Sequence, residues 1–238
     1  KVFTDPRMRD RLINNVVLTA TEKNYYGVVF NFGYIATEDN SQFVITVSKS
    51  AARLNRRGKL VIVSIIAGIN DEGIDYESLG RAANFIELRT FRWDQNQSPP
   101  ASISPLDRIR ETISEVTALV DSRFILIGLP NYGYDWALPF VQGSTIAEMI
   151  SNIEAEGIAG RTGASVQFDE TAQSPYFIYS NGTGTAHEVW FDNMRSISAR
   201  LELAEEYNLA GVSIWTIMNP FPAGIQALDE QFDVISTL

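Results

Sequence analysis

Residues 60–67 form the segment that most restricts how this chain can fold. The segment reads LVIVSIIA, a nearly continuous run of β-branched and other apolar residues. A strand with one face in water alternates apolar and polar residues, whereas a strand covered on both faces reads as a continuous apolar run. Strands of the second kind belong to parallel sheets with helices on both sides. The segment therefore predicts an α/β fold.

The rest of the chain alternates strand-like and helix-like segments around this run. A first helix is expected near Pro6, with Thr4 or Asp5 as its N-cap. Apolar runs and helical periodicity define the later elements. The expected strands are 25–35, 59–67, 84–91, 124–129 and 210–217, and the expected helices between them are 39–55, 75–83, 106–120 and 193–207. This rhythm predicts βα units, with five strands where a closed (β/α)8 barrel requires eight.

A different pattern stands between the last two of these strands. Residues 145–162 read as a helix. Short segments at 166–169, 176–179 and 188–191 read as antiparallel strands, with a turn at Asn181-Gly182. This part of the chain predicts a small α+β region.

Composition excludes several classes of site. The chain has 238 residues, no cysteine, one histidine and a formal charge of −10. Without cysteine there are no disulfides, thiolate zinc sites or cysteine nucleophiles, and one histidine excludes a histidine-rich metal site. The acidic balance argues against nucleic acid as a partner, because phosphate binding needs clustered Lys and Arg. No apolar run reaches the roughly 20 residues of a membrane span, and no metal or organic cofactor is implied.

Three segments carry a resemblance to a known family. They are 127–140 (IGLPNYGYDWALPF), 167–177 (QFDETAQSPYF) and 211–215 (GVSIW). Together they resemble glycoside hydrolase family 18, in particular its branch of bacterial spore-cortex N-acetylglucosaminidases. The resemblance extends over nearly the whole chain.

The resemblance implies a (β/α)8 TIM-type barrel over residues 1–238, with a small α+β insertion at 140–192 between strands seven and eight. Residues 26–33 match strand four of that barrel, so strands one to three are absent from the chain. An open barrel leaves unpaired strand edges that pair readily with other segments. We therefore expect an upstream segment or a partner chain to complete the barrel.

The resemblance also implies where catalysis would occur. At strand four the family carries Asp-Gly-x-(Asp/Asn)-x-Asp-Phe-Glu, in which the Glu protonates the departing oxygen. The Asp two residues earlier orients the substrate's acetamido group, and residues two apart on a strand share a face. This chain reads YGVVFNFG there, so Gly33 stands at the acid position and Asn31 at the orienting position. Glycine has no proton to give, and a positioned acid contributes about 10²- to 10⁴-fold.

Strand six departs from the family pattern as well. The family's Met-x-Tyr-Asp is replaced so that Phe91 and Arg92 stand at the Tyr and Asp positions. The hydroxyl expected to contact the acetamide is lost, and a cation replaces an acid. Glu38 and Asp39 follow strand four, where they act either as a displaced acid or, by the simpler interpretation, as caps of the next helix.

The family's sugar-binding positions are retained in part. Aromatic faces stack on sugar rings while polar neighbours fix the orientation. The alternatives are core packing for the aromatic rings and local turn support for the polar side chains. His187 is expected to be a surface residue at a strand edge. The residues carried over as substrate-binding are Tyr132, Tyr134, Asp135, Trp136, Glu170, Gln173 and Trp215.

These residues predict a catalytically inactive family 18 relative. It would bind N-acetylglucosamine-containing glycan, such as peptidoglycan or chitin, or act structurally in a spore or cell-envelope layer. One alternative is an active or residual endo-N-acetylglucosaminidase acting on spore-cortex peptidoglycan. Another is a protein-binding assembly module. By the same resemblance, the expected location is the spore, the cell envelope or the extracellular space.

Overall fold

The computed structural model describes residues 2–68, 73–91 and 96–232. The chain divides into two compact units. Unit 1 comprises Lys1–Thr90, Thr112–Ile127 and Tyr207–Gly211, and unit 2 comprises Phe91–Glu111, Gly128–Glu206 and Val212–Leu238.

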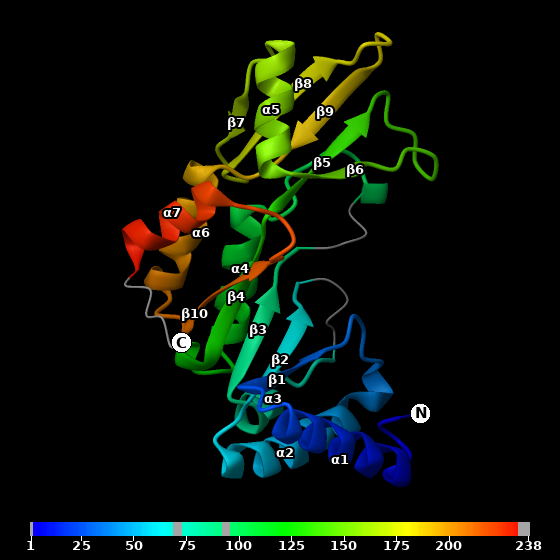
Figure 1. Cartoon of the computed structure of the whole chain (residues 1–238), viewed down its shortest axis with the longest axis vertical. Helices are drawn as coiled ribbons and strands as arrows, with labels where there is room; N and C mark the ends of the chain where they lie inside the picture. Colours follow the sequence, from blue (N-terminus) through cyan, green and yellow to red (C-terminus); the bar gives the residue numbers. More distant parts are fainter. Residues whose placement is uncertain (1, 69–72, 92–95, 233–238) are drawn as a thin grey trace. The chain divides into compact units, whose positions relative to one another are not determined.

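The first sheet contains the five predicted barrel-type strands (Figure 1). Its order is β1-β2-β3-β4-β10, and β1, β2 and β3 pair in parallel. The strands are β1 (Gly27–Asn31), β2 (Leu60–Ile66), β3 (Phe85–Arg89), β4 (Ile125–Pro130) and β10 (Gly211–Trp215). This arrangement confirms the predicted α/β fold of a partial TIM-type barrel.

Helices alternate with the strands of unit 1 as the βα rhythm predicts; the first helix precedes β1, and the last belongs to this unit only from Thr112 onward. They are α1 (Pro6–Glu22), α2 (Asn40–Leu54), α3 (Tyr76–Ala82) and α4 (Leu106–Thr117). Asp5 caps α1, because its carboxylate accepts hydrogen bonds from the backbone N–H groups of Arg7 and Met8, at 2.8 and 3.3 Å. The core of this unit packs Val17 and Val47 of the helices with Val63 and other buried residues of the sheet.

One glycine of β1 is required by close packing. A Cβ atom added to Gly27 would lie 2.5 Å from the backbone oxygen of Leu60 on the neighbouring strand. Any larger residue would force β1 away from β2 at the start of their pairing. The glycine of the family's strand-four pattern is therefore kept for a structural reason.

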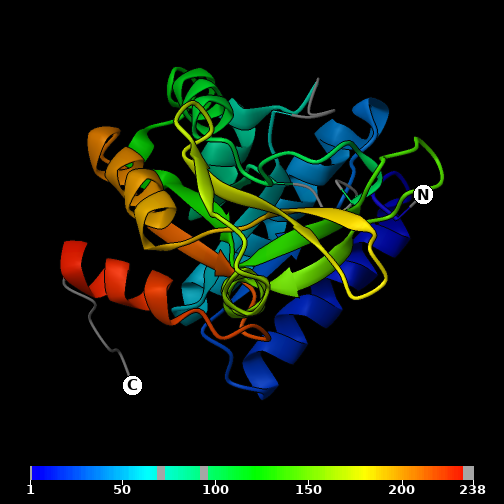
Figure 2. The same ribbon diagram turned by 90° about the horizontal axis from the view of Figure 1, so that it is seen from above.

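Unit 2 contains a second sheet, which is antiparallel with order β6-β5-β9-β8-β7. Its strands are β5 (Tyr132–Ala137), β6 (Glu148–Ser151), β7 (Gln167–Asp169), β8 (Ser174–Ser180) and β9 (Ala186–Trp190). Helix α5 (Asn152–Thr162) covers one face, where Ala155 and Ala159 share a core with Phe177 and Val189. The three predicted antiparallel strands are confirmed. Figure 2 shows α6 (Met194–Glu206) and α7 (Pro222–Gln231) side by side.

One predicted helix in this region begins too early, and strands β5 and β6 and helix α7 were missed. The expected helix 145–162 begins only at Asn152, because residues 148–151 pair with β5 as strand β6. Ser151 ends that strand and caps α5 by accepting a hydrogen bond from the Glu154 N–H at 3.1 Å. Strand β5 and helix α7 were not predicted. The second sheet begins with β5, before residue 140, and the 140–192 bounds of the insertion stay a prediction.

Candidate functional site

A row of aromatic side chains lies on one face of β5. Tyr132, Tyr134 and Trp136 alternate along the strand and therefore share a face. Their ring centroids follow one another at 5.6 and 5.5 Å in edge-to-face contacts. Each ring is at most 1% exposed, and the Trp136 indole N–H donates to the backbone oxygen of Ser98 at 2.8 Å. In this structure these rings are covered by protein, so their predicted contact with a sugar stays a prediction.

The aromatic row continues through Phe91 to Trp215. The ring centroid of Phe91 lies 6.3 Å from that of Tyr132 and 6.3 Å from that of Trp215. Phe91 is buried, whereas Trp215 is only partly buried. Trp215 is therefore the least buried member of the row, and the buried ring of Phe91 packs edge-to-face against it.

Asn131 fixes the backbone around Trp215. Its side-chain oxygen accepts from the Thr216 N–H at 2.5 Å, and its amide NH₂ donates to the oxygens of Thr216 and Asn219 at 2.5 and 2.9 Å. Its backbone N–H donates to the oxygen of Trp215 at 2.8 Å. Asn131 is buried and was missed by the sequence analysis. The only signal was an amide residue at the end of an apolar strand, and its partners lie more than eighty positions away.

The other face of β5 carries a polar network centred on Asp135. One carboxylate oxygen accepts from the Tyr179 hydroxyl at 2.6 Å, and the other lies 2.8 Å from His187 Nδ1. Burial, and then the hydrogen bond to this carboxylate, raise the pKa of the Tyr179 hydroxyl. The Asp135 carboxylate is thus engaged by two protein groups.

Asn181 defines which nitrogen of His187 carries the proton. The side-chain oxygen of Asn181 accepts from the N–H and hydroxyl of Thr183 and the N–H of Thr185. Its NH₂ group must therefore face His187 Nε2, 3.0 Å away, and donate to it. The proton of the neutral ring then sits on Nδ1 and is donated to Asp135. His187, with its side chain 18% exposed, is part of this network, so its prediction as a surface residue was wrong.

Glu170 and Gln173 support a turn between β7 and β8. The Gln173 NH₂ group donates to the backbone oxygen of Glu170 at 2.6 Å. The Glu170 carboxylate accepts from the Arg195 guanidinium at 2.6 Å, and this bond holds the pKa of Glu170 below its ordinary value. These contacts support the alternative interpretation, in which the two residues stabilise a turn. Their predicted contact with glycan stays a prediction.

Unit 1 holds Asn31 and Gly33, the residues that the resemblance places at the family's catalytic positions. Strand β1 ends at Asn31, and both Asn31 and Gly33 are exposed. Phe32 between them packs edge-to-face on Phe3 and Phe43, with centroids 5.3 and 5.7 Å apart. Among the described residues, no atom lies within 4 Å of a Cβ atom added to Gly33.

Comparison with known proteins identifies the family. Residues 1–219 match the model for glycosyl hydrolases family 18. The chain belongs to this family. It is 31% identical over 241 residues to the cortical fragment-lytic enzyme of Bacillus subtilis (strain 168), covering 98% of this chain and 56% of that protein.

Solved structures agree with this assignment. The crystal structure of the spore cortex-lytic enzyme SleL from Bacillus megaterium QM B1551 matches with a TM-score of 0.93 and 29% identity, covering 100% of this chain and 56% of that one. A shorter match, 29% over 114 residues, links 40% of the chain to 31% of di-N-acetylchitobiase from Rattus norvegicus. The chain spans about half the length of the bacterial relatives it matches.

Two described acidic residues bear on the predicted catalytic positions, Asp39 after β1 and Glu87 on β3. Asp39 stands at the N-cap position of α2, but its side chain makes no capping hydrogen bond, so the predicted cap is not found. The register of the parallel strands forms a row across the sheet, in which Asn31 of β1 lies opposite Ser64 of β2, and Ser64 lies opposite the buried Glu87 of β3. The sequence analysis missed Glu87 because the other members of this row are distant in sequence. Arg92 lies outside the described residues.

The described residues form neither a metal-binding cluster nor a membrane-spanning helix. Across residues 2–68, 73–91 and 96–232, no group of three or more His, Asp or Glu side chains is placed to hold a metal ion. Within the same ranges, no helix has the length and apolar character needed to cross a membrane.

Proposed function

We propose that this family 18 chain binds N-acetylglucosamine-containing glycan, peptidoglycan or chitin, without hydrolysing it. The observation that carries the proposal is the glycine at position 33, in open space at the acid position, in a chain that keeps the supported ring of Trp215. The names of the relatives, which refer to spore cortex and to chitobiose, support the glycan class. They also support a location in the spore or the cell envelope.

The loss of catalysis follows from what the remaining side chains can do. Family members use the substrate's own acetamido oxygen as the nucleophile, so the enzyme must supply an acid and a carboxylate that stabilises the developing positive charge. Gly33 supplies no proton. The neutral amide of Asn31 can hydrogen-bond an acetamide but cannot balance that charge. Binding needs neither function, because stacking on an aromatic ring involves no proton transfer.

Replacing Trp215 with alanine is expected to weaken binding of an N-acetylglucosamine tetramer roughly fivefold, since one aromatic contact contributes about 1 kcal/mol. Calorimetric titration measures the change. Trp215→Phe should keep most of the affinity. Tyr25→Ala, which removes an exposed ring outside the aromatic row, should keep all of it. Equal affinity in the wild-type chain and Trp215→Ala would rule out this ring as the platform.

A residual glycosidase is the second candidate function, and Glu87 is the observation that favours it. This carboxylate lies in the same row across the sheet as Asn31, one strand beyond Ser64. It is the best-placed substitute for the missing acid in the part of unit 1 that the structure describes. The assembly-module alternative would be favoured by a complete absence of glycan binding.

We also infer that further barrel strands cover the open edges of the first sheet. In the described sheet β1 pairs only with β2 and β10 only with β4, and Tyr26 and Val29 at the β1 edge are exposed. The free backbone N–H and C=O groups of an unpaired strand edge can pair with a strand of another chain. The isolated 238-residue chain should therefore scatter light as a species heavier than its 26.5 kDa monomer. Val29→Lys, a charge on that edge, should reduce the association. A monomer with a cooperative melt would contradict the inference.

A further inference from the structure

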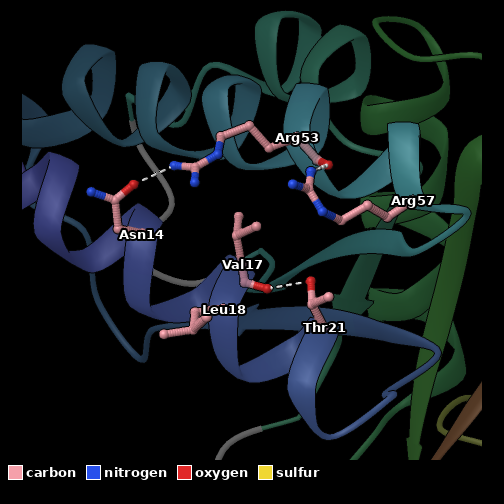
Figure 3. Close-up of a pocket in the computed structure, with 6 residues that line it drawn as sticks. All are labelled: Asn14, Val17, Leu18, Thr21, Arg53 and Arg57. Atoms are coloured by element: carbon pink, nitrogen blue, oxygen red, sulfur yellow. Dashed lines mark hydrogen bonds between the residues drawn. The ribbon is translucent and has the colours of Figure 1, made fainter.

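Figure 3 shows a groove between α1 and α2 in unit 1 that the proposed glycan site does not use. Its volume is about 300 Å³. Asn14, Val17, Leu18 and Thr21 of α1 line one side, and Arg53 of α2 and Arg57, in the turn that follows it, line the other. A groove of this size lies at the small end of the range for ligand sites.

Side-chain pairing between the two helices repeats every four residues, and among the described residues it gives two arginines no carboxylate partner. At the first level Lys49 pairs with Asp10 at 3.2 Å. At the next level, four residues along both helices, Arg53 instead donates to the neutral side chain of Asn14 at 2.5 Å.

Arg57 stands at the third level, opposite the apolar Leu18 and the hydroxyl of Thr21. Its guanidinium donates to the backbone oxygen of Arg53 at 2.7 Å. Among the described residues, neither Arg53 nor Arg57 forms an ion pair. Two neighbouring guanidiniums repel each other, and each has five N–H donors that fit carboxylate oxygens.

The charge distribution of the chain supports an anionic ligand here. Residues 1–59 contain ten Lys or Arg and five Asp or Glu, a balance of +5, while the whole chain carries −10. The groove therefore lies in the one strongly basic part of an acidic protein. A neutral N-acetylglucosamine polymer offers no group that would use these charges.

The groove also offers apolar surface beside the two arginines. Leu18 is 55% exposed, whereas Val17 is buried. A ligand that satisfies both features carries a carboxylate next to an aliphatic group. Peptide segments with an acidic residue or a free C-terminus beside an aliphatic residue have this chemistry.

We propose that the α1–α2 groove binds a short acidic peptide segment, with its carboxylates on Arg53 and Arg57 and an aliphatic side chain on Leu18. The proposal does not depend on glycan binding. Its simplest probe is the dipeptide N-acetyl-Leu-Glu with a free C-terminal carboxylate. Two matched probes are N-acetyl-Leu-Gln-amide, which has no charge, and succinate, which has two carboxylates without the leucine side chain.

Titration of the full chain with N-acetyl-Leu-Glu, followed by ¹⁵N NMR, is expected to shift amide signals around Leu18 and Arg57 with saturation. Arg53→Gln/Arg57→Gln should weaken binding about tenfold or more, because hydrogen bonds between charged groups are lost. Arg56→Gln removes the same charge next to the groove without lining it, and should change affinity less than about twofold. Asn14→Asp should also weaken binding, since its carboxylate would occupy Arg53.

Several outcomes would overturn the proposal. They are no saturable shift up to about 10 mM peptide, equal binding of the uncharged amide, and unchanged affinity in the double variant with an unchanged thermal melt. If succinate bound as tightly as the peptide, the proposed contact between an aliphatic side chain and Leu18 would be wrong. A short DNA oligonucleotide that binds more tightly than the peptide would assign the arginines to phosphate instead.

Discussion

Replacing Arg200 with alanine is expected to lower the free energy of unfolding by about 3 to 5 kcal/mol, because it strands a buried carboxylate. Arg200 lies on α6 with no exposed surface, and its Nη1 is 3.0 Å from the Asp192 carboxylate. Burial lowers the pKa of Arg200 and raises that of Asp192, so each charge depends on the other. Chemical denaturation with global fitting measures the change.

The Arg200 guanidinium also connects segments distant in sequence. Its Nε and Nη2 donate to the backbone oxygen of Ser104 at 3.1 and 2.7 Å, and Nη1 donates to that of Ser196 at 2.6 Å. Nη2 also donates to the Ser174 hydroxyl at 3.0 Å. The alanine variant therefore leaves several buried acceptors without a donor, which adds to the cost.

Arg110→Ala is the matched control, since it removes an arginine from an exposed ion pair with Glu206 on the same helix as Arg200. Exposed pairs contribute about 0 to 1 kcal/mol, so this variant should unfold nearly as the wild type does. Equal losses in the two variants, or a loss below about 1 kcal/mol for Arg200→Ala, would contradict the structural role given to the buried pair.

Incubation of the chain with cortex fragments or chitin oligomers is expected to yield no new reducing ends above a buffer control. By the proposed alignment with family 18, the missing acid alone costs about 10²- to 10⁴-fold in rate. In the same alignment, Asn31 lacks the carboxylate charge and Phe91 lacks the hydroxyl expected to contact the acetamide. Mass spectrometry of the products measures the outcome, with an active family 18 chitinase as the positive control.

Variants identify the source of any turnover that does appear. Activity that disappears in Glu87→Gln, with an unchanged thermal melt, would assign the acid to β3, in the same row across the sheet as Asn31. Activity lost in Glu38→Gln or Asp39→Asn would assign it to the segment after β1. Either result would replace the binding-only proposal with the glycosidase alternative.

The regular parts of the fold could be predicted because their signals are local. The apolar run at 60–67 predicted the bounds of β2 to within one residue, and helical periodicity predicted α2 and α6. Strand β6 was missed because four residues carry too little periodicity, and its pairing with β5 is a tertiary contact. The strand character of β5 was hidden within a segment interpreted only as a family signature.

The site was less predictable because its geometry depends on pairing across the sequence. Trp215 and the β5 aromatics could be named from the family resemblance, but their very different burial could not. The roles of Asn131, His187 and Glu87 emerge only when distant strands come together. His187 was misjudged because a lone histidine near a strand end gives no indication of a carboxylate fifty positions earlier.

The most direct test of the central claim is one NMR experiment on the wild-type chain with an N-acetylglucosamine tetramer, recorded over a day. We expect a saturable shift of the Trp215 indole N–H signal, while the anomeric proton signals of the sugar remain those of the intact tetramer. New anomeric signals from shorter oligomers would contradict the absence of catalysis. An indole signal unchanged up to about 10 mM sugar would contradict glycan binding.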